Sequence, residues 1–276
     1  MDFLDRLAAR VEESGTYLCL GIDPDPAALP AGYPPDVLGV ERLANLLVDN
    51  ATRHAAAVKV NLAFFEAFGS AGIAALERIR ARLPADMPFI ADAKRGDIGS
   101  TAARQAVALF DALGADAVTA NPYLGYDALA PLVERDGRFV YVVCRTSNPA
   151  AAEIQNLPVE GDPLYVHVAR RAVEWAESRG NVGLVVGATA PDELRVLRGA
   201  APALPFLVPG IGAQGGDVDA VVAHGPARGG DAGERRGGAL LVNVSRAIAD
   251  AAREGDDDPS AAVSAAAARW AGLLRC

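Results

Sequence analysis

The sequence has few residues of the kinds that build metal sites and disulfide frameworks. Its 276 residues include three cysteines, Cys19, Cys144 and Cys276, and three histidines. Neither type occurs at the spacing of metal ligands, so we expect no metal site. An odd number of scattered cysteines is typical of reduced thiols, which predicts a cytoplasmic protein. Because Cys19 and Cys144 lie within apolar runs, we expect both to be buried.

Lysine is almost absent as well. It occurs only at Lys59 and Lys94, so arginine supplies the other 26 − 2 = 24 basic residues. An arginine is effectively always protonated, whereas a lysine ammonium is compact and can release its proton. The two lysines are therefore candidates for a chemical role, with chance retention as the alternative for either one alone.

Positive charge and long apolar runs are scarce too. The net charge of −9 at pH 7 predicts no non-specific binding of nucleic acid, which needs a basic face. An anionic small molecule could still bind through local cationic groups. No apolar run approaches the roughly 18 residues of a membrane-spanning helix, so we expect no contact with a membrane. The first residues, MDFLDRLAARVEESG, predict an amphipathic helix rather than a signal or transit peptide.

Hydrophobic residues, in contrast, make up 51% of the chain and recur in short runs rich in β-branched residues. Eight such runs follow one another at intervals of roughly 30 residues, with helical patterns such as Ser70–Arg82 and Leu164–Arg179 between them. Apolar runs without alternation indicate parallel strands that are buried on both faces. We therefore expect an α/β fold, a (β/α)8 TIM barrel, although a doubly wound sheet would give the same alternation. The runs are Tyr17–Asp23, Ala56–Leu62, Pro88–Lys94, Ala117–Asn121, Phe139–Arg145, Val182–Gly187, Pro205–Pro209 and Ala239–Val244.

The chain is expected to form one domain over residues 1–276, because no linker rich in Gly, Ser or Pro divides it. The nearest candidate, His224–Gly238, is expected to be a surface loop that replaces part of a helix between the last two strands. The acidic run Asp256–Asp258 is expected to be a solvated turn before a final Ala-rich helix.

Polar residues gather where the predicted strands end. In a (β/α)8 barrel the carboxyl ends of the strands carry the active site, so this distribution supports the barrel. The residues are Asp23, Lys59, Asn61, Asp92, Lys94, Asn121, Arg145–Ser147, Pro209–Gly216 and Ser245–Arg246.

The third strand end carries the most informative pattern. Asp92 and Lys94 are two residues apart on a strand and therefore point to the same face, which can be the barrel interior. A buried Asp beside a Lys is costly unless it has a purpose. For Asp-x-Lys alone, a structural ion pair at the barrel mouth is an equally good explanation.

The longer stretch Phe89–Thr101, FIADAKRGDIGST, resembles the signature of the orotidine 5′-phosphate decarboxylase family over its whole length. Further segments resemble that family in the same order, so the resemblance covers nearly the whole chain. The sequences of these segments are most similar to those of the longer bacterial subgroup, which carries DAKRGDIGST. Residues Asn243–Arg246 read NVSR, whereas the family pattern is NSSR, and this difference leaves the role of Val244 open. The further segments are Leu18–Pro26, Val58–Glu66, Cys144–Pro149, Pro209–Asp217 and Asn243–Ile248.

The resemblance implies a cofactor-free decarboxylation of orotidine 5′-phosphate to UMP. Removing CO2 from C6 of the pyrimidine leaves a carbanion without a conventional electron sink, so catalysis needs preorganised charge and a proton donor. By the resemblance, Lys94 is the donor and Asp92 lies beside the departing carboxylate. Lys59 and Asp97 complete an alternating array of charges.

The resemblance also implies a homodimer. In the family, the second Asp of the motif and the Thr four residues later reach the site of the neighbouring subunit, so Asp97 and Thr101 would act across the interface. Asp23 and Lys59 would hold the ribose hydroxyls, and Ser147 would bond the pyrimidine edge. Ile98 is expected among the substrate contacts.

A phosphate site is predicted after the seventh and eighth strands. The glycines of PGIGAQGGD, Pro209–Asp217, can expose backbone N–H groups, and the segment leads into a helix whose N-terminus favours an anion. Gln214 can reach over the phosphate, Gly212 can contact it and Arg246 can bind it in a bidentate manner. A Gly-rich segment alone is more often an ordinary turn, but barrels commonly bind phosphate at this position.

Three other functions remain open at this point. Magnesium-dependent sugar-phosphate aldolases and decarboxylases also carry Asp-x-Lys-x-x-Asp, although the Ile-Gly-x-Thr extension and PGIGAQGGD argue against them. A non-catalytic barrel would bind a nucleotide phosphate such as UMP without turnover. A Schiff-base aldolase would act through Lys59 or Lys94, and borohydride would trap its adduct.

Overall fold

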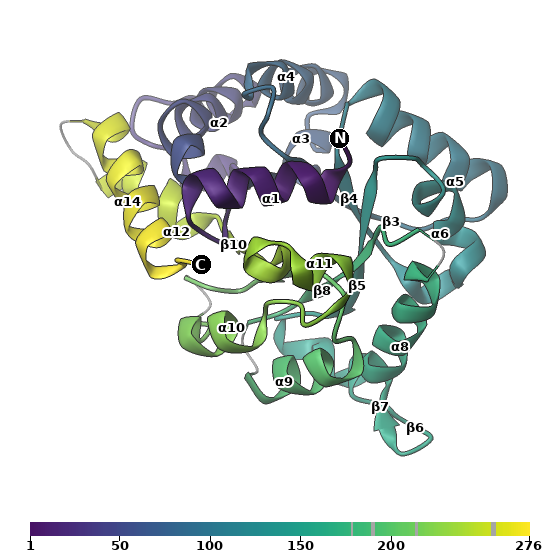
Figure 1. The fold of residues 1–276 in the computed structure, drawn as a ribbon. Coiled ribbons are helices and arrows are strands. Elements are labelled where there is room, and N and C mark those ends of the chain that lie inside the picture. The colour runs from purple at the N-terminus through teal and green to yellow at the C-terminus, as the bar shows by residue number, and fades with distance from the viewer. Residues whose placement is uncertain (178, 189–190, 213–214, 255–257) are drawn as a thin grey trace.

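The structure is a computed structural model that describes residues 1–177, 179–188, 191–212, 215–254 and 258–276. The barrel strands are β1 (Leu18–Ile22), β2 (Ala57–Asn61), β3 (Phe89–Arg95), β4 (Ala117–Ala120), β5 (Phe139–Arg145), β8 (Val182–Val186), β9 (Phe206–Pro209) and β10 (Leu241–Val244). Within the described ranges these eight strands are parallel, pair in chain order and close into a barrel where β10 meets β1. Figure 1 shows the helices arranged around the strands. The predicted (β/α)8 barrel is therefore confirmed, and a doubly wound sheet is excluded.

Helices surround the barrel, and the predicted helical stretches correspond to α4 and α8. They are α1 (Phe3–Ser14), α2 (Val37–Ala51), α3 (Ala63–Glu66), α4 (Gly69–Arg82), α5 (Gly99–Ala106), α6 (Tyr126–Val133), α7 (Ala152–Gln155), α8 (Leu164–Ala176), α9 (Pro191–Ala200), α10 (Val218–His224), α11 (Gly230–Glu234), α12 (Arg246–Ala249), α13 (Ala251–Glu254) and α14 (Pro259–Leu273). The shorter elements are η1 (Pro26–Ala28), η2 (Thr52–His54), the π-helical η3 (Val107–Ala112), η4 (Pro122–Leu124), η5 (Pro149–Ala151) and η6 (Arg236–Ala239), with the hairpin β6 (Pro158–Val159) and β7 (Asp162–Pro163).

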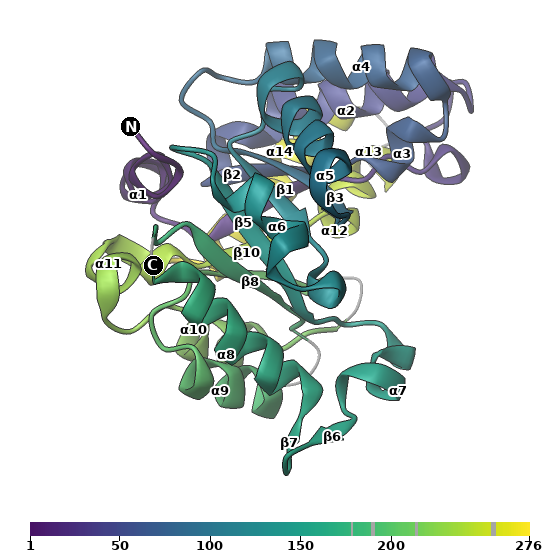
Figure 2. The same ribbon diagram turned by 90° about the vertical axis from the view of Figure 1, so that its right-hand side faces the viewer.

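The barrel interior changes from apolar to polar along its axis. Alternate residues of a strand point inward, so each strand contributes successive layers. At the amino end, inward residues such as Ile90 and Leu241 pack against Phe3 and Leu7 of α1. In Figure 2, α1 lies at one end of the strands, while α3 and α7 lie at the other. The next inward positions, two residues further along their strands, are the buried polar residues Lys59, Asp92, Thr119 and Asn243.

The segment His224–Gly238 is not the surface loop that the sequence suggested. It contains α11 and η6, and its Ala227 and Ala232 are buried against the cluster that includes α1. Arg236 forms an ion pair of 2.8 Å with Glu12 of α1. The prediction failed because the buried residues are small and follow no helical period, so composition alone resembled a loop.

The cysteine predictions are confirmed for the two buried positions. Cys19 and Cys144 are free thiols inside the fold, and burial raises the pKa of Cys19 to about 12. Of the predicted acidic turn, only Asp258 lies within the described residues, where its side chain caps α14. None of the described helices is both long enough and apolar enough to cross a membrane.

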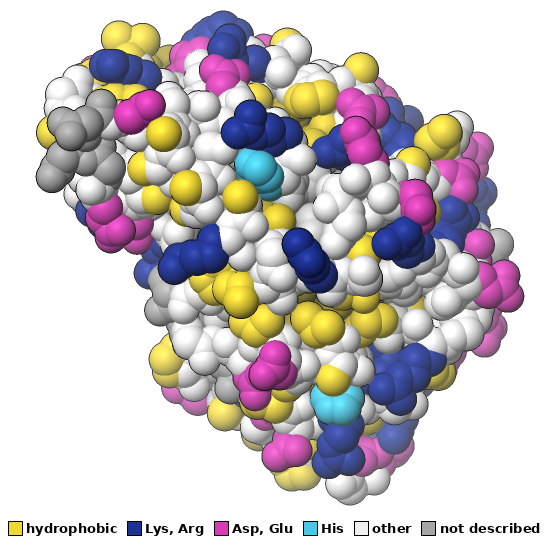
Figure 3. All heavy atoms as spheres, turned by 60° about the vertical axis from the view of Figure 1, so that its left-hand side comes forward, with side chains coloured by type: hydrophobic (Ala, Val, Ile, Leu, Met, Phe, Trp, Pro, Cys, Tyr) yellow, Lys and Arg dark blue, Asp and Glu magenta, His cyan; other side chains and the backbone are white. Residues whose placement is uncertain are grey.

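The surface carries charges of both signs. On the face shown in Figure 3, Lys and Arg side chains are interspersed with Asp and Glu, and hydrophobic side chains lie between them. The negative net charge is therefore not gathered into one acidic patch on this face.

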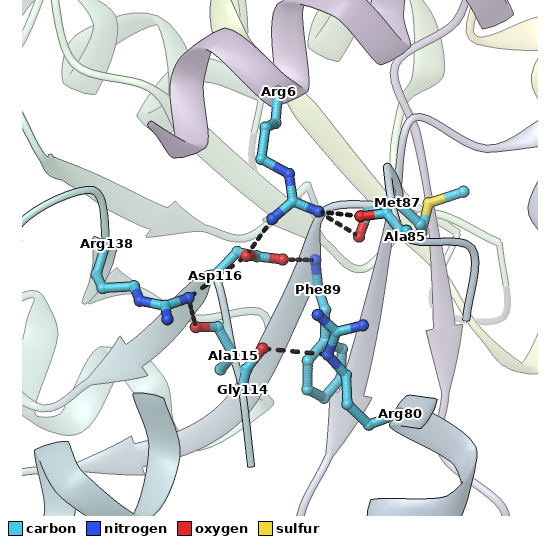
Figure 4. A network of polar contacts seen from close by, with 9 residues as sticks. All are labelled: Arg6, Arg80, Ala85, Met87, Phe89, Gly114, Ala115, Asp116 and Arg138. Carbon is cyan, nitrogen blue, oxygen red and sulfur yellow. Dashed lines mark hydrogen bonds and ion pairs between the residues drawn. The ribbon is translucent and has the colours of Figure 1, made fainter. Parts of the chain in front are cut away.

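A charged network holds α1 against the amino end of the barrel (Figure 4). Asp116 directly precedes β4, is buried, and accepts hydrogen bonds from Arg6 and from the backbone N–H of Phe89, the latter at 2.9 Å. Arg138 approaches the same carboxylate at 3.5 Å. Arg6 also donates to the carbonyl of Ala85 at 2.9 Å. One carboxylate thus joins α1 to the first residues of two strands.

Asp116→Ala is expected to destabilise the fold by roughly 2–4 kcal/mol, since it leaves two guanidinium groups and a buried N–H without their acceptor. Urea unfolding followed by circular dichroism would measure this difference. Asp136→Ala removes the partner of Arg179 at an exposed site and should stay within about 0.5 kcal/mol of the parent. Equal losses in the two variants would contradict a structural role for the network.

Candidate active site

A cavity of about 300 Å³ opens at the carboxyl ends of the barrel strands. Every barrel strand, or the segment that follows it, contributes to the lining. Most of the polar strand-end residues named from the sequence belong to this lining, whereas Asn121 and Arg145 do not. The lining residues are Asp23, Lys59, Asn61, Asp92, Lys94, Thr119, Thr146, Ser147, Asn148, Val185, Leu207, Pro209, Gly210, Ile211, Asn243, Ser245 and Arg246.

The floor of the cavity carries three charged groups in direct contact. Lys59 on β2 donates from Nζ to Asp92 Oδ2 at 2.8 Å, and Lys94 donates to Asp92 Oδ1 at 2.6 Å. Asp23 lies 3.6 Å from the Lys59 ammonium. The strand register places Lys59 beside Ile90, two residues before Asp92, and the ammonium groups of both lysines meet at the Asp92 carboxylate. One carboxylate therefore bridges both lysines of the chain.

Electrostatics keep this array ionised. Burial alone would raise the pKa of Asp92, but the two ammonium groups outweigh burial and hold this pKa well below its usual range. Burial alone would lower the pKa of Lys59, but Asp23 and Asp92 outweigh it and raise the pKa. At neutral pH Asp92 and Lys59 thus form a pair of opposite charges on the cavity floor.

Lys94 differs from Lys59 in both exposure and backbone conformation. Its side chain is 50% exposed, whereas that of Lys59 is 5% exposed. Its φ of +45° lies in the left-handed region, which is costly for a residue other than glycine. The pairing of β3 with β4 is also irregular between Ala91 and Arg95. The backbone is thus held in a strained form at the residue whose ammonium faces the open cavity.

Two glycines of the segment after β9 adopt positive φ values. Gly210 and Gly212 have φ values of +103° and +92°, and a Cβ on Gly212 would lie 3.1 Å from Ala247 Cβ. Gly212 itself is not among the residues that line the cavity. Gln214 lies outside the described residues.

Some N–H groups of this segment already have acceptors within the chain. The N–H groups of Gly215 and Gly216 do not face the cavity, because they donate to the carbonyls of Gly212 and Gly210 at 2.9 and 3.1 Å. At the N-terminus of α10, the Asp217 side chain accepts from the N–H of Ala220. The chain satisfies these donors itself, a competition that sequence pattern does not reveal.

Arg246 lies where the prediction placed it, on the cavity rim after β10. It is exposed, and no carboxylate among the residues that the structure describes forms an ion pair with it. The bend of the chain at Ser245, the N-cap of α12, directs the following residues away from the strand. Arg246 is therefore a cation available to an anionic ligand.

Ser147 also lines the cavity, on the segment after β5. The side chain of Gln155 braces this segment, because it accepts from the N–H of Thr146 at 2.9 Å and donates to Thr146 Oγ1 at 2.8 Å. The backbone of Ser147 packs closely against Gly187, where a Cβ would lie 2.8 Å from the Ser147 nitrogen.

Three predicted site residues are not brought into this cavity. Asp97, Ile98 and Thr101 follow β3 and do not belong to its lining. Ile98 is 58% exposed although it is apolar, and Tyr123 and Leu124 on the next strand end are 85% and 52% exposed.

Sequence reasoning missed two buried polar residues of the cavity. Thr119 and Asn243 are 1% and 7% exposed, and each lies two residues after an apolar inward residue of its strand. That spacing could have identified them. Within the described ranges, no three His, Cys, Asp or Glu side chains form a group that could hold a metal ion.

The fold and the cavity together define a (β/α)8-barrel enzyme with a lysine–aspartate array at the carboxyl ends of its strands. Residues 16–263 match the model of the Orotidine 5'-phosphate decarboxylase / HUMPS family, and the chain belongs to this family. The predicted family resemblance is therefore confirmed.

Individual relatives agree over most of the chain. Orotidine 5'-phosphate decarboxylase of Thermomicrobium roseum is 46% identical over 250 residues, which covers 90% of this chain and 86% of the relative. Orotidine 5'-phosphate decarboxylase of Natronomonas pharaonis is 46% identical over 274 residues, which covers 98% of this chain and 97% of the relative. The solved structure of Leishmania donovani OMP decarboxylase has a TM-score of 0.82 and 38% identity, with 99% of both chains covered.

Proposed function

We propose that this chain decarboxylates orotidine 5′-phosphate to UMP, the last step of pyrimidine nucleotide synthesis. The observation that carries the proposal is the Lys59–Asp92–Lys94 array on the floor of a cavity whose rim holds Arg246. The relatives that match 90% and 98% of this chain are named orotidine 5'-phosphate decarboxylase, which supports the choice of substrate.

The charge array accounts for the chemistry. The bond from C6 to the carboxylate breaks, CO2 leaves, and the electron pair stays on C6. The Lys94 ammonium stabilises this developing charge and transfers a proton to C6. Asp92 lies beside the departing carboxylate, and its negative charge disfavours the carboxylate relative to the uncharged product CO2. Lys59 holds Asp92 in place and keeps it ionised.

Substrate contacts away from C6 are assigned to other residues of the rim. Asp23 lines the cavity with Oδ1 3.6 Å from the Lys59 ammonium, and Oδ1 accepts no hydrogen bond from the residues that the structure describes, so the carboxylate can accept from a ribose hydroxyl. Ser147 is assigned to the pyrimidine edge, and Gln214, Gly212 and Arg246 to the phosphate. These contacts supply binding energy remote from the reacting carbon.

Arg246→Ala is expected to lower kcat/KM roughly 100-fold, because a bidentate guanidinium–phosphate contact is lost, and Gln214→Ala should lower it less. Steady-state kinetics with orotidine 5′-phosphate would measure both values. Arg253→Ala provides a matched control, since this arginine pairs with Asp250 on the surface. Wild-type kinetics in both phosphate variants would contradict the assignment.

We propose that the working unit is a homodimer in which Asp97, Ile98 and Thr101 complete the site of the partner subunit. Their position outside the cavity of their own chain supports this arrangement. The exposed Ile98, Tyr123 and Leu124 supply apolar surface next to the cavity mouth, which an interface would cover.

We further propose one domain over residues 1–276 and a cytoplasmic location. Contact between the first and last parts of the chain supports the single domain. The hydroxyl of Thr16, just before β1, donates a hydrogen bond to the carbonyl of Leu274 at 2.9 Å. The buried free thiols of Cys19 and Cys144 support a reducing compartment.

A magnesium-dependent sugar-phosphate enzyme is the main alternative. Its metal would need open carboxylate oxygens, whereas both oxygens of Asp92 are bonded to ammonium groups. The deciding experiment follows the absorbance of orotidine 5′-phosphate after addition of EDTA-treated protein. Rapid loss of absorbance supports the proposal. No loss would refute it, and activity on a sugar phosphate that depends on added magnesium would support the alternative.

A further inference from the structure

Thr119 occupies a central place beside the charge array. It is the third residue of β4, is 1% exposed and borders the cavity between the two lysine-bearing strands and β5. Its hydroxyl donates to Asp92 Oδ1 at 2.8 Å and accepts from the backbone N–H of Lys94 at 2.9 Å. One hydroxyl thus joins the side chain of the carboxylate to the backbone of the lysine.

The strand pairing explains why a hydroxyl is needed there. Val118 pairs with Ala91 and Ala120 pairs with Arg95, so one residue of β4 lies opposite three residues of β3. Such a bulge leaves backbone groups without their regular ladder partners. Thr119 Oγ1 replaces the missing acceptor for the N–H of Lys94. It thereby supports the left-handed backbone of Lys94, whose φ is +45°.

The same hydroxyl also fixes the rotation of the Asp92 carboxylate. Oδ2 is held by Lys59 at 2.8 Å, and Oδ1 is shared by Lys94 Nζ and Thr119 Oγ1 at 2.6 and 2.8 Å. Lys94 has to leave Oδ1, at least in part, when it transfers its proton. Thr119 is then the remaining donor that holds Oδ1 in place.

We propose that Thr119 is a positioning residue for the decarboxylation, which sets Asp92 and Lys94 in the geometry that the chemical step requires. The inference rests on the proposed function of the cavity. Thr119 acts through these two residues, since its single proton is already donated to Asp92. Its loss should therefore affect the chemical step more than the binding of a nucleotide.

The test compares Thr119→Val, which keeps the shape but loses the hydroxyl, with Thr119→Ser, which keeps the hydroxyl. We expect Thr119→Val to lower kcat roughly 10- to 100-fold, as for the loss of a hydrogen bond to a charged group, with the Kd of UMP changed by less than about threefold. Thr119→Ser should retain kcat within about threefold of the parent.

Thr16→Val is the matched control. Thr16 is equally buried, at 1% exposure, and its hydroxyl also joins backbone groups, but at the amino end of β1. The Thr16→Val substitution should lower the Tm while leaving kcat unchanged. Because Thr119→Val could fail to fold, Thr119→Ala is measured beside it, and its loss of kcat should likewise exceed its effect on UMP binding.

The outcomes separate this inference from the proposed function. No turnover by the parent protein refutes the proposed function itself. Turnover by the parent together with unchanged kcat in Thr119→Val or Thr119→Ala overturns only the role of Thr119. The role of Thr119 is also overturned if Thr119→Ser is as slow as Thr119→Val, or if UMP binding by Thr119→Val weakens in proportion to its kcat.

Discussion

Lys94→Ala is expected to lower kcat for orotidine 5′-phosphate by roughly 10⁴-fold or more, because the change removes both a proton donor and a preorganised positive charge. The ammonium of Lys94 is 2.6 Å from Asp92 and half exposed to the cavity, so it can reach a bound substrate. Absorbance assays at high enzyme concentration would measure the residual rate. UMP should still bind, since the phosphate and ribose contacts remain.

Lys94→Arg distinguishes the donor role from charge alone. A guanidinium keeps the charge but does not give up its proton, so we expect turnover to stay far below that of the parent protein. Arg95→Ala is the matched control at the next position, because Arg95 pairs with Glu66 away from the array and should be dispensable. Near-normal turnover by Lys94→Arg would show that Lys94 is not the proton donor.

Mixing two inactive variants is the second expected result of large effect. Asp97→Ala and Lys94→Ala should each be nearly inactive alone, whereas a mixture refolded together should recover about one quarter of the parent activity, as a two-fold symmetric dimer requires. Half of the random dimers contain both variants. If Asp97 acts in the partner's site, each such dimer has one site with both changes and one site with neither.

The control for this experiment mixes Lys94→Ala with Asp92→Asn. Both residues line the cavity of their own chain, so no combination restores a complete site, and no activity should return. Size-exclusion chromatography and native mass spectrometry would establish that mixed dimers form. If mixed dimers form from Asp97→Ala and Lys94→Ala without recovery of activity, Asp97 does not act across an interface.

Several features of the site followed from the sequence because they depend on local spacing. Asp92 and Lys94 are two residues apart on a strand, which places both side chains inside the barrel. Arg246 follows the last strand, where barrels commonly bind phosphate. Continuous apolar runs separated by helical patterns predicted the strands of the barrel to within a residue or two at their ends.

Other features did not follow because residue type alone does not show which donor takes which acceptor, or which small residues pack against a distant helix. The N–H groups of Gly215 and Gly216 bond within their own loop, and Asp217 caps the helix that was expected to face the phosphate. The segment His224–Gly238 packs against α1 through small residues that carry no periodic pattern.

The sequence by itself determined the family, the barrel and the identity of the two lysines and their acidic neighbours, since these are encoded in residue type and in the spacing of residues along the chain. Only the tertiary structure decided how they are joined. The bridge from Lys59 through Asp92 to Lys94, and the Thr119 hydroxyl that supports it, bring together three strands. The pairing of β2 with β3 and the irregular pairing of β3 with β4 set these distances, and neither is visible in a linear pattern.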